Sequence, residues 1–172
     1  MSSIIEFFNA NKLKYTASSN GNDDVNYAFD KNDNRIQHGP NAFWMVTFER
    51  IVTIVSYFIT SKSSWTSWYM KSWDISYSID GSTFNHLQTD SVSSLHGNTK
   101  IFPLNKQINC KSFKITAVSD SDGESYLLFN SFDCFSPVPL KKTIKQCSCN
   151  CVHCKNRMTS NFLLLFTFIT TK

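Results

Sequence analysis

The sequence lacks the short motifs that mark the common enzyme classes. It contains no glycine-rich phosphate loop, no HExxH zinc motif and no nucleophile elbow. Its histidines are scattered along the chain without a matched acidic residue: His38, His86, His96 and His153. We therefore expect no catalysis from this chain.

Long apolar runs and basic clusters are also missing. The apolar run at residues 162–169 covers 8 residues, whereas a membrane helix needs roughly 20. Residues 1–13 show no signal peptide, so we expect a reducing compartment, cytoplasmic by default. Six of the 17 Lys and Arg follow Pro137, which leaves 11 basic against 13 acidic side chains in residues 1–136. This balance argues against a nucleic-acid surface.

The composition that remains is that of a β-rich globular protein. Hydrophobic residues make up 41% of the chain and aromatic residues 15%, which is enough for a packed core. A chain of 172 residues fits one domain with an additional tail. We expect the domain at residues 1–136 and a disordered or loosely attached basic tail at residues 137–172.

The clearest local pattern lies in residues 73–84. Four apolar residues alternate there with polar ones: Trp73, Ile75, Tyr77 and Ile79. This alternation predicts a strand with all four side chains on one buried face, and Asp80-Gly81 predicts the turn that ends it. Truncation of Tyr77 to alanine would then open a core cavity and cost roughly 3–5 kcal/mol.

Other segments predict further short strands separated by turns. Residues 51–55 are apolar on both faces, which predicts a central strand that is covered on each side. Residues 3–11 fit either a short helix or a capping turn, and both interpretations stay open. The further strands are expected at residues 12–18, 43–48, 101–104, 110–118 and 126–135. The pattern as a whole favours an all-β protein, a two-sheet antiparallel sandwich.

The order of these elements resembles the discoidin domain, also called the coagulation-factor type C domain. The resemblance covers about residues 13–136 and depends on AFD at 28–30, SYSIDGSTF at 76–84, CKSFKIT at 110–116 and YLLFNSFDCF at 126–135. It implies a galactose-binding-like jelly roll. It also implies a recognition module for glycans, phospholipid head groups or proteins, as in cell adhesion.

The resemblance further implies that loops at one end of the sandwich contact the ligand. By position these loops are residues 18–26, 31–41, 60–72 and 119–125. The candidate ligand-binding residues within them are Asn22, Asp23, Arg35, His38, Trp65 and Trp68. Their polar groups can hydrogen-bond a glycan and their flat aromatic rings can stack on a sugar, although ordinary solvated loops have the same composition. For Tyr69 we favour a place in the core.

A structural calcium ion is also implied by the resemblance. Family members commonly bind calcium through an aspartate at the position of Asp30, and Asp33 could add a further oxygen. Lys31 stands where the family usually has glycine. The alternative role of Asp30 is an Asx-type turn.

The cysteines fall into two groups. If residues 111–118 paired with residues 126–135 around a turn at Asp122, Cys110 and Cys134 would be cross-strand neighbours. They are then either two buried thiols or, in an oxidising compartment, a bridge. The run CSCNCVHC at residues 147–154 could chelate zinc, but it lacks a second, separated knuckle. We interpret it as part of a tail outside the fold.

The sequence therefore supports two hypotheses of different classes. The first is a non-catalytic recognition module that binds a carbohydrate or a protein through its end loops. The second is a structural or adaptor domain that packs against a neighbour and binds no small ligand.

Overall fold

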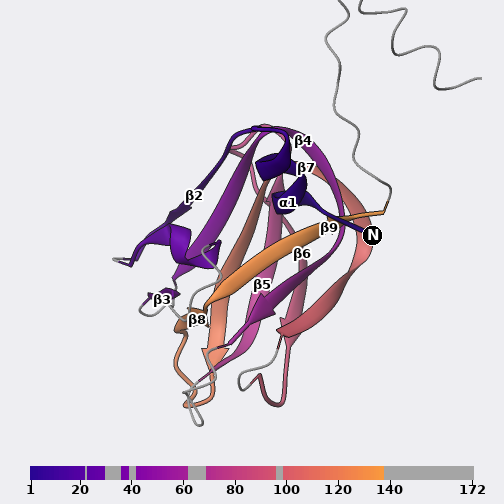
Figure 1. The fold of residues 1–172 in the computed structure, drawn as a ribbon. Coiled ribbons are helices and arrows are strands. Elements are labelled where there is room, and N and C mark those ends of the chain that lie inside the picture. Colours follow the sequence, from indigo (N-terminus) through magenta and orange to yellow (C-terminus); the bar gives the residue numbers. More distant parts are fainter. Residues whose placement is uncertain (22, 30–35, 39–41, 62–68, 96–98, 138–172) are drawn as a thin grey trace, which may run out of the picture. The chain divides into compact units, whose positions relative to one another are not determined.

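A computed structural model describes residues 1–21, 23–29, 36–38, 42–61, 69–95 and 99–137 (Figure 1). For residues 36–38 it describes the backbone alone. These residues all belong to one compact unit, Met1–Leu140. The cysteine run at residues 147–154 lies outside the described residues.

The described residues form an antiparallel β-sandwich, which confirms the predicted fold class. The strands of the main sheet follow the order β1-β9-β4-β7-β5-β6, with β2 also paired to β4, and β3 pairs with β8 in a small second sheet. One α-helix and one 3₁₀ helix accompany them. The elements are β1 (Ser2–Ser3), α1 (Ile4–Ala10), β2 (Tyr15–Ser19), η1 (Val25–Ala28), β3 (Ile36–His38), β4 (Phe43–Thr60), β5 (Met70–Ser78), β6 (Asn85–Ser91), β7 (Thr99–Asp120), β8 (Leu127–Phe129) and β9 (Ser131–Ser136).

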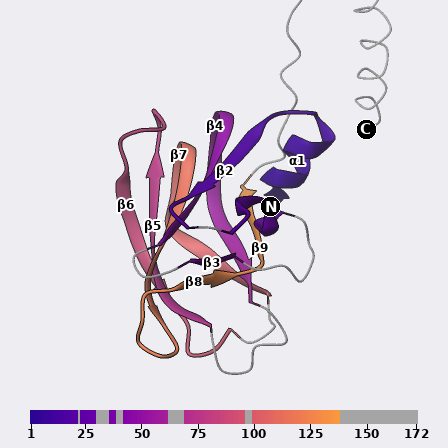
Figure 2. The ribbon, with the colours of Figure 1, turned by 90° about the vertical axis from the view of Figure 1, so that its left-hand side faces the viewer.

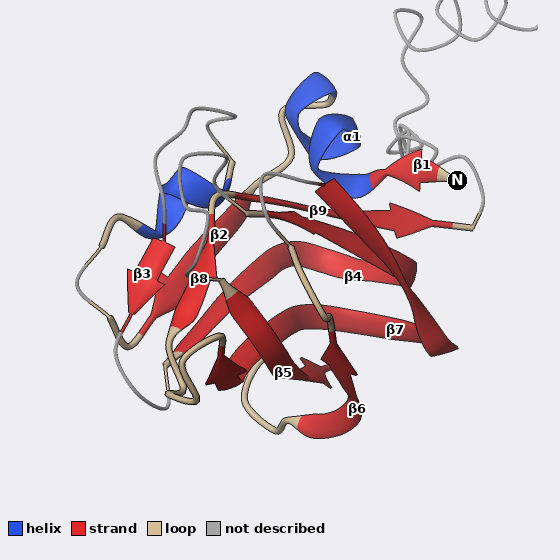
Figure 3. Ribbon diagram, turned by 90° about the horizontal axis from the view of Figure 1, so that it is seen from below, coloured by secondary structure: helices blue, strands red, loops and turns tan. Residues whose placement is uncertain are grey.

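Strands β4 and β7 are long enough to run through both layers of the sandwich. Residues 43–47 of β4 pair with residues 112–116 of β7, and residues 52–60 pair with residues 99–110. The register shifts between these two stretches, where both strands bend. As a result, the two ends of each strand lie at the same end of the molecule (Figures 1 and 3). We call this the loop end, and we call the opposite end, where the strands bend, the corner end.

The continuity of β4 and β7 corrects our sequence-based boundaries. We predicted that Glu49-Arg50 separates two strands, but these residues form the bend of a single strand, β4. Likewise, the short strand at residues 101–104 and the strand at 110–118 are both parts of β7. The predicted last strand at residues 126–135 is instead two strands, β8 and β9. The polar or turn residues that suggested boundaries in β4 and β7 lie where a strand bends or shifts register.

The prediction that residues 51–55 are covered on both faces is wrong. Ile51 is 54% exposed and Val55 is half-buried, whereas Val52 and Ile54 are buried. Strand β4 is central in the hydrogen-bonding order, but one of its faces points outward. On that outer face Phe58 packs against Phe135 of β9, with ring centroids 6.0 Å apart. Phe58 on this face therefore makes a contact between neighbouring strands.

The predicted buried face of residues 73–79 is only half right. Trp73 and Ile75 are fully buried, but Tyr77 is half-buried and Ile79, beyond the end of β5, is 56% exposed. The pairing of β5 with β6 shifts register between Ile75 and Ser76, and such a shift interrupts a simple alternation. The loss of unfolding free energy expected on truncating Tyr77 to alanine is correspondingly smaller than we inferred from the pattern.

The turn after β5 agrees with the prediction. Asp80 Oδ1 accepts hydrogen bonds from the backbone N–H groups of Ser82 and Thr83, both at 2.8 Å. These bonds hold the pKa of the Asp80 carboxyl well below its usual range. Gly81 has a φ of 87°, a conformation that side chains with a Cβ rarely adopt.

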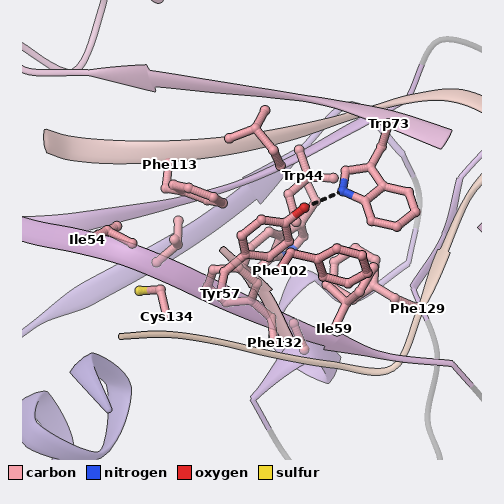
Figure 4. Packing of buried hydrophobic residues seen from close by; sticks show 14 of the residues in the cluster. Trp44, Ile54, Tyr57, Ile59, Trp73, Phe102, Phe113, Phe129, Phe132 and Cys134 are labelled. Atoms are coloured by element: carbon pink, nitrogen blue, oxygen red, sulfur yellow. Dashed lines mark hydrogen bonds between the residues drawn. The ribbon is translucent and has the colours of Figure 1, made fainter. Parts of the chain in front are cut away.

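The core between the layers is largely aromatic, as Figure 4 shows. The indole N–H of Trp73 donates to the hydroxyl of Tyr57 at 2.6 Å, and that hydroxyl donates to Asp90 Oδ2 at 2.5 Å. Burial raises the pKa of Tyr57, and the nearby Asp90 carboxylate raises it further. This chain of hydrogen bonds satisfies polar groups of the core and connects β4, β5 and β6.

Residues 3–11 form a helix rather than a capping turn. Ser3 caps it, since its hydroxyl accepts the backbone N–H of Glu6 at 3.0 Å. The same hydroxyl donates to Asp133 of β9, and the other oxygen of that carboxylate accepts the N–H of Ile5 at 3.1 Å. Ile4 and Phe8 are fully buried. The helix is therefore part of the sandwich core at the corner end.

Cys110 and Cys134 are both buried free thiols, as one of our two alternatives stated. The strand pairing that led us to them is nevertheless wrong. Strand β7 pairs with β4 and β5 and does not pair with β9, so Cys110 lies opposite Val52 and Cys134 lies opposite Tyr57 on β4. Burial raises the pKa of Cys110 to about 12 and that of Cys134 well above its usual value.

Candidate functional site

Several chain connections meet at the loop end. The side chain of Asn20, after β2, accepts the backbone N–H of Phe43 at 2.8 Å. The indole N–H of Trp44 donates to the carbonyl of Val25 at 3.0 Å, and Ala117 N–H donates to the carbonyl of Ala42 at 3.0 Å. These bonds bring the segment after β2, the start of β4 and the last part of β7 together (Figure 2).

A second group of bonds is centred on Tyr69, just before β5. Its carbonyl accepts the N–H of Ser121 at 2.9 Å, and its own N–H donates to Ser121 Oγ at 3.4 Å. Its hydroxyl donates to the carbonyl of Ser93 at 2.7 Å. The ring packs against the core, which confirms the structural role we preferred for this residue. The sequence alone gave no sign that one tyrosine would join three connections.

The turn after β7 is organised by Asp120. This residue is almost fully buried, and its Oδ1 accepts the backbone N–H groups of Asp122 at 3.0 Å and Glu124 at 2.9 Å. Gly123 has a φ of 91°. The predicted turn at Asp122 is therefore present over residues 120–124, and its tip exposes Asp122 and Glu124. These hydrogen bonds join described residues of three of the four predicted ligand loops, and residues 36–38 of the fourth form β3.

The structure describes two of the six predicted ligand-binding residues. Asp23 is half-buried in the connection between β2 and η1, next to Asp24, which caps η1 through the N–H of Asn26. His38 ends β3, and its backbone pairs with Leu127 of β8. The remaining candidates lie outside the described residues: Asn22, Arg35, Trp65 and Trp68.

The predicted calcium ligands Asp30 and Asp33 also lie outside the described residues. The structure nevertheless shows an oxygen near the start of β3. In the antiparallel pairing of β3 with β8, Ile36 lies opposite Phe129, and Asn130 directly follows Phe129. Asn130 is 6% exposed, and its Oδ1 has no hydrogen-bond partner in the described part of the chain. A buried oxygen without a partner fits a cation ligand, and the LLF residues before it did not point to this role.

Within the described ranges no three His, Cys, Asp or Glu side chains group to hold a metal ion. In the same ranges no helix is long and apolar enough to cross a membrane. The described part of the loop end offers polar side chains, backbone groups and carboxylates, among them the half-buried Asp23 and the exposed Asp122 and Glu124.

Comparison with known families identifies the domain. A family model of the F5/8 type C domain matches residues 14–132. The chain belongs to this family. The match confirms the resemblance to the discoidin, or coagulation-factor type C, domain. No protein in the curated collection of sequences matches the chain.

Solved structures share the fold of this F5/8 type C domain at low sequence identity. A CBM32 module from Clostridium perfringens, in complex with GalNAc-β-1,3-galactose, is 12% identical with a TM-score of 0.65 and aligns over 78% of this chain and 100% of that one. The family 32 carbohydrate-binding module of C. perfringens NanJ, in complex with galactose, is 17% identical with a TM-score of 0.60, over 70% and 92% of the two chains. An F5/8 type C domain from Bacteroides fragilis is 14% identical with a TM-score of 0.61, over 70% and 89%.

Proposed function

We propose that this F5/8 type C domain is a non-catalytic carbohydrate-binding module whose ligand contacts the loop end. The observation that carries the proposal is the convergence of the segment after β2, the residue before β5 and the turn after β7 at one end of the sandwich. The named ligands of two structural neighbours, galactose and GalNAc-β-1,3-galactose, support a galactose-containing glycan.

The residue types at the loop end suit the surface of a sugar. Carboxylates such as Asp23 and the exposed Asp122 accept hydrogen bonds from sugar hydroxyls. Trp65 and Trp68, from the sequence, supply flat apolar faces on which a sugar ring can stack. Binding of this kind combines shape complementarity with hydrogen bonds and requires no catalytic side chain.

A glycan array followed by calorimetric titration with galactose and GalNAc-β-1,3-galactose tests the proposal. We expect hits among galactose-containing glycans, and we expect Trp65→Ala to lower the affinity at least tenfold. Ile79→Ser is a matched control, because Ile79 is exposed next to the turn at the corner end and its loss should leave the affinity unchanged. An array without hits would refute the proposal and favour the adaptor hypothesis.

We also propose that the domain holds a structural calcium ion beside β8. Asp30, Asp33 and Asn130 are the residues that would hold it, since they offer carboxylate and amide oxygens, the ligands that calcium prefers. When bound, the ion would stabilise the chain segments that supply its ligands. The orphaned Oδ1 of Asn130 supports this proposal.

A further inference from the structure

The residue that joins the connections at the loop end is a single tyrosine. Tyr69 bonds through its backbone to Ser121 in the turn after β7 and through its hydroxyl to Ser93 in the connection after β6. Two residues later, the carbonyl of Lys71 accepts the N–H of Val92 at 2.9 Å. Both connections are thus fastened to the chain segment that enters β5.

The Tyr69 ring and its hydroxyl have separable roles. The half-buried ring packs against the core, and a phenylalanine would preserve that contact. The hydroxyl reaches a backbone carbonyl that is held in place by its neighbours, because Val92 and Leu95 are buried on either side of Ser93. A hydrogen bond between a fixed donor and a fixed acceptor sets the relative orientation of the two groups and buries little additional surface.

We infer that Tyr69 is a positioning residue: its hydroxyl holds the connection after β6, and its backbone N–H and carbonyl hold Ser121 in the turn at residues 121–124, so that the two connections keep one arrangement. The inference that this arrangement sets ligand affinity rests on the proposed function. The turn carries Asp122 and Glu124 at its exposed tip. A turn that is held in one conformation pays less conformational entropy when a ligand orders its side chains.

The test combines Tyr69→Phe with a control at the other end of β5. Tyr69→Phe removes the bond from the hydroxyl to the Ser93 carbonyl, and the amides of Val92 and Ser121 keep their acceptor carbonyls. We expect both amides to exchange with deuterium roughly two- to tenfold faster, because the connection after β6 is then no longer fastened to the Tyr69 side chain and the segment opens more often. We expect a several-fold loss of affinity for GalNAc-β-1,3-galactose with little change in melting temperature. Tyr77→Phe removes the hydroxyl of another half-buried tyrosine and should change neither exchange at these amides nor affinity.

The outcomes separate this inference from the proposed function. Unchanged exchange at Val92 and Ser121 in Tyr69→Phe would overturn the positioning role, whether or not glycans bind. Faster exchange with unchanged affinity would overturn the link to recognition. A parent protein that binds neither sugar would refute the proposed function, while the exchange measurement would still decide whether the hydroxyl holds the two connections together.

Discussion

The two ends of the sandwich are stabilised by different interactions. At the corner end, buried side chains hold the chain: Phe8 of α1 packs edge-on against Phe48 of β4, with ring centroids 5.2 Å apart, and the buried Asp133 anchors the start of the helix. At the loop end, hydrogen bonds to backbone groups hold it, such as those that Tyr69 makes with Ser93 and Ser121.

This difference shows where the fold can tolerate change. A packed side chain at the corner end contributes through buried area, and its loss leaves a cavity that the rest of the core cannot fill. A hydrogen-bonded connection at the loop end contributes local order, and its exposed residues can change at little cost in stability. Recognition can therefore vary at the loop end while the corner end preserves the sandwich.

The largest effect we predict is at the centre of the core. Trp73→Ala should lower the free energy of unfolding by about 3–5 kcal/mol, because Trp73 is fully buried and donates to Tyr57. Tyr77→Ala, on the same strand but half-buried, should cost about half as much. Urea unfolding measures both changes. Equal losses for the two variants would mean that burial does not distinguish these positions.

The calcium ion that we propose should give the next largest effect. At a calcium concentration 100 times the dissociation constant, we expect a stabilisation of about 2.7 kcal/mol, seen as a rise in melting temperature. Chelation should reverse it, and Asn130→Ala should reduce it because a ligand oxygen is lost. A melting midpoint that is unchanged in excess calcium would remove the ion from the description of this domain.

Asp133 gives a smaller, pH-dependent effect at the corner end. Burial raises the pKa of this carboxyl, with a further contribution from Glu6, although hydrogen bonds from Ser3, Ile5 and Cys134 oppose the shift. The folded state then binds a proton more tightly than the unfolded state. This group's stabilising contribution is therefore complete below the unfolded pKa, near 4, and is lost as the pH rises through the folded pKa.

Asp133→Asn tests this sign, because asparagine preserves an acceptor oxygen and cannot ionise. We expect the parent to lose stability relative to Asp133→Asn as the pH rises from about 4, measured by urea unfolding across the range. Asp122→Asn, an exposed carboxylate at the loop end, serves as the control. Parallel curves of stability against pH for the parent and Asp133→Asn would contradict a buried Asp133 carboxyl with a raised pKa.

The sequence predicted the sandwich because alternation and turn residues are local signals. Trp73 and Ile75 are buried as the pattern required, and Asp80-Gly81 forms the expected turn. The pairing of strands is not a local signal. We joined neighbouring segments around the turn at Asp122, whereas β7 pairs with β4 and β5. A jelly roll places sequence neighbours in different layers, and no single segment encodes that choice.

The site could be predicted less fully than the fold. The resemblance indicated which loops lie at one end, and the described parts of these loops do converge there. Asn130 and Tyr69 carry no comparable signal, because an asparagine after an apolar run and a tyrosine among serines are common. The role of Tyr69 depends on partners 24 and 52 residues away in the sequence. The role proposed for Asn130 depends on a buried oxygen without a partner in the described part of the chain.

The smallest effect on stability should come from a tryptophan-to-alanine substitution at the loop end. We predicted Trp65 from the sequence as a loop residue that contacts ligand, so Trp65→Ala should change the free energy of unfolding by less than about 0.5 kcal/mol. Its glycan affinity should nevertheless fall. Trp73→Ala and Trp65→Ala remove the same side chain, so urea unfolding and glycan titration of this pair compare the centre of the core with the loop end. A loss of several kcal/mol in Trp65→Ala would show that the loop end, too, depends on buried aromatic packing.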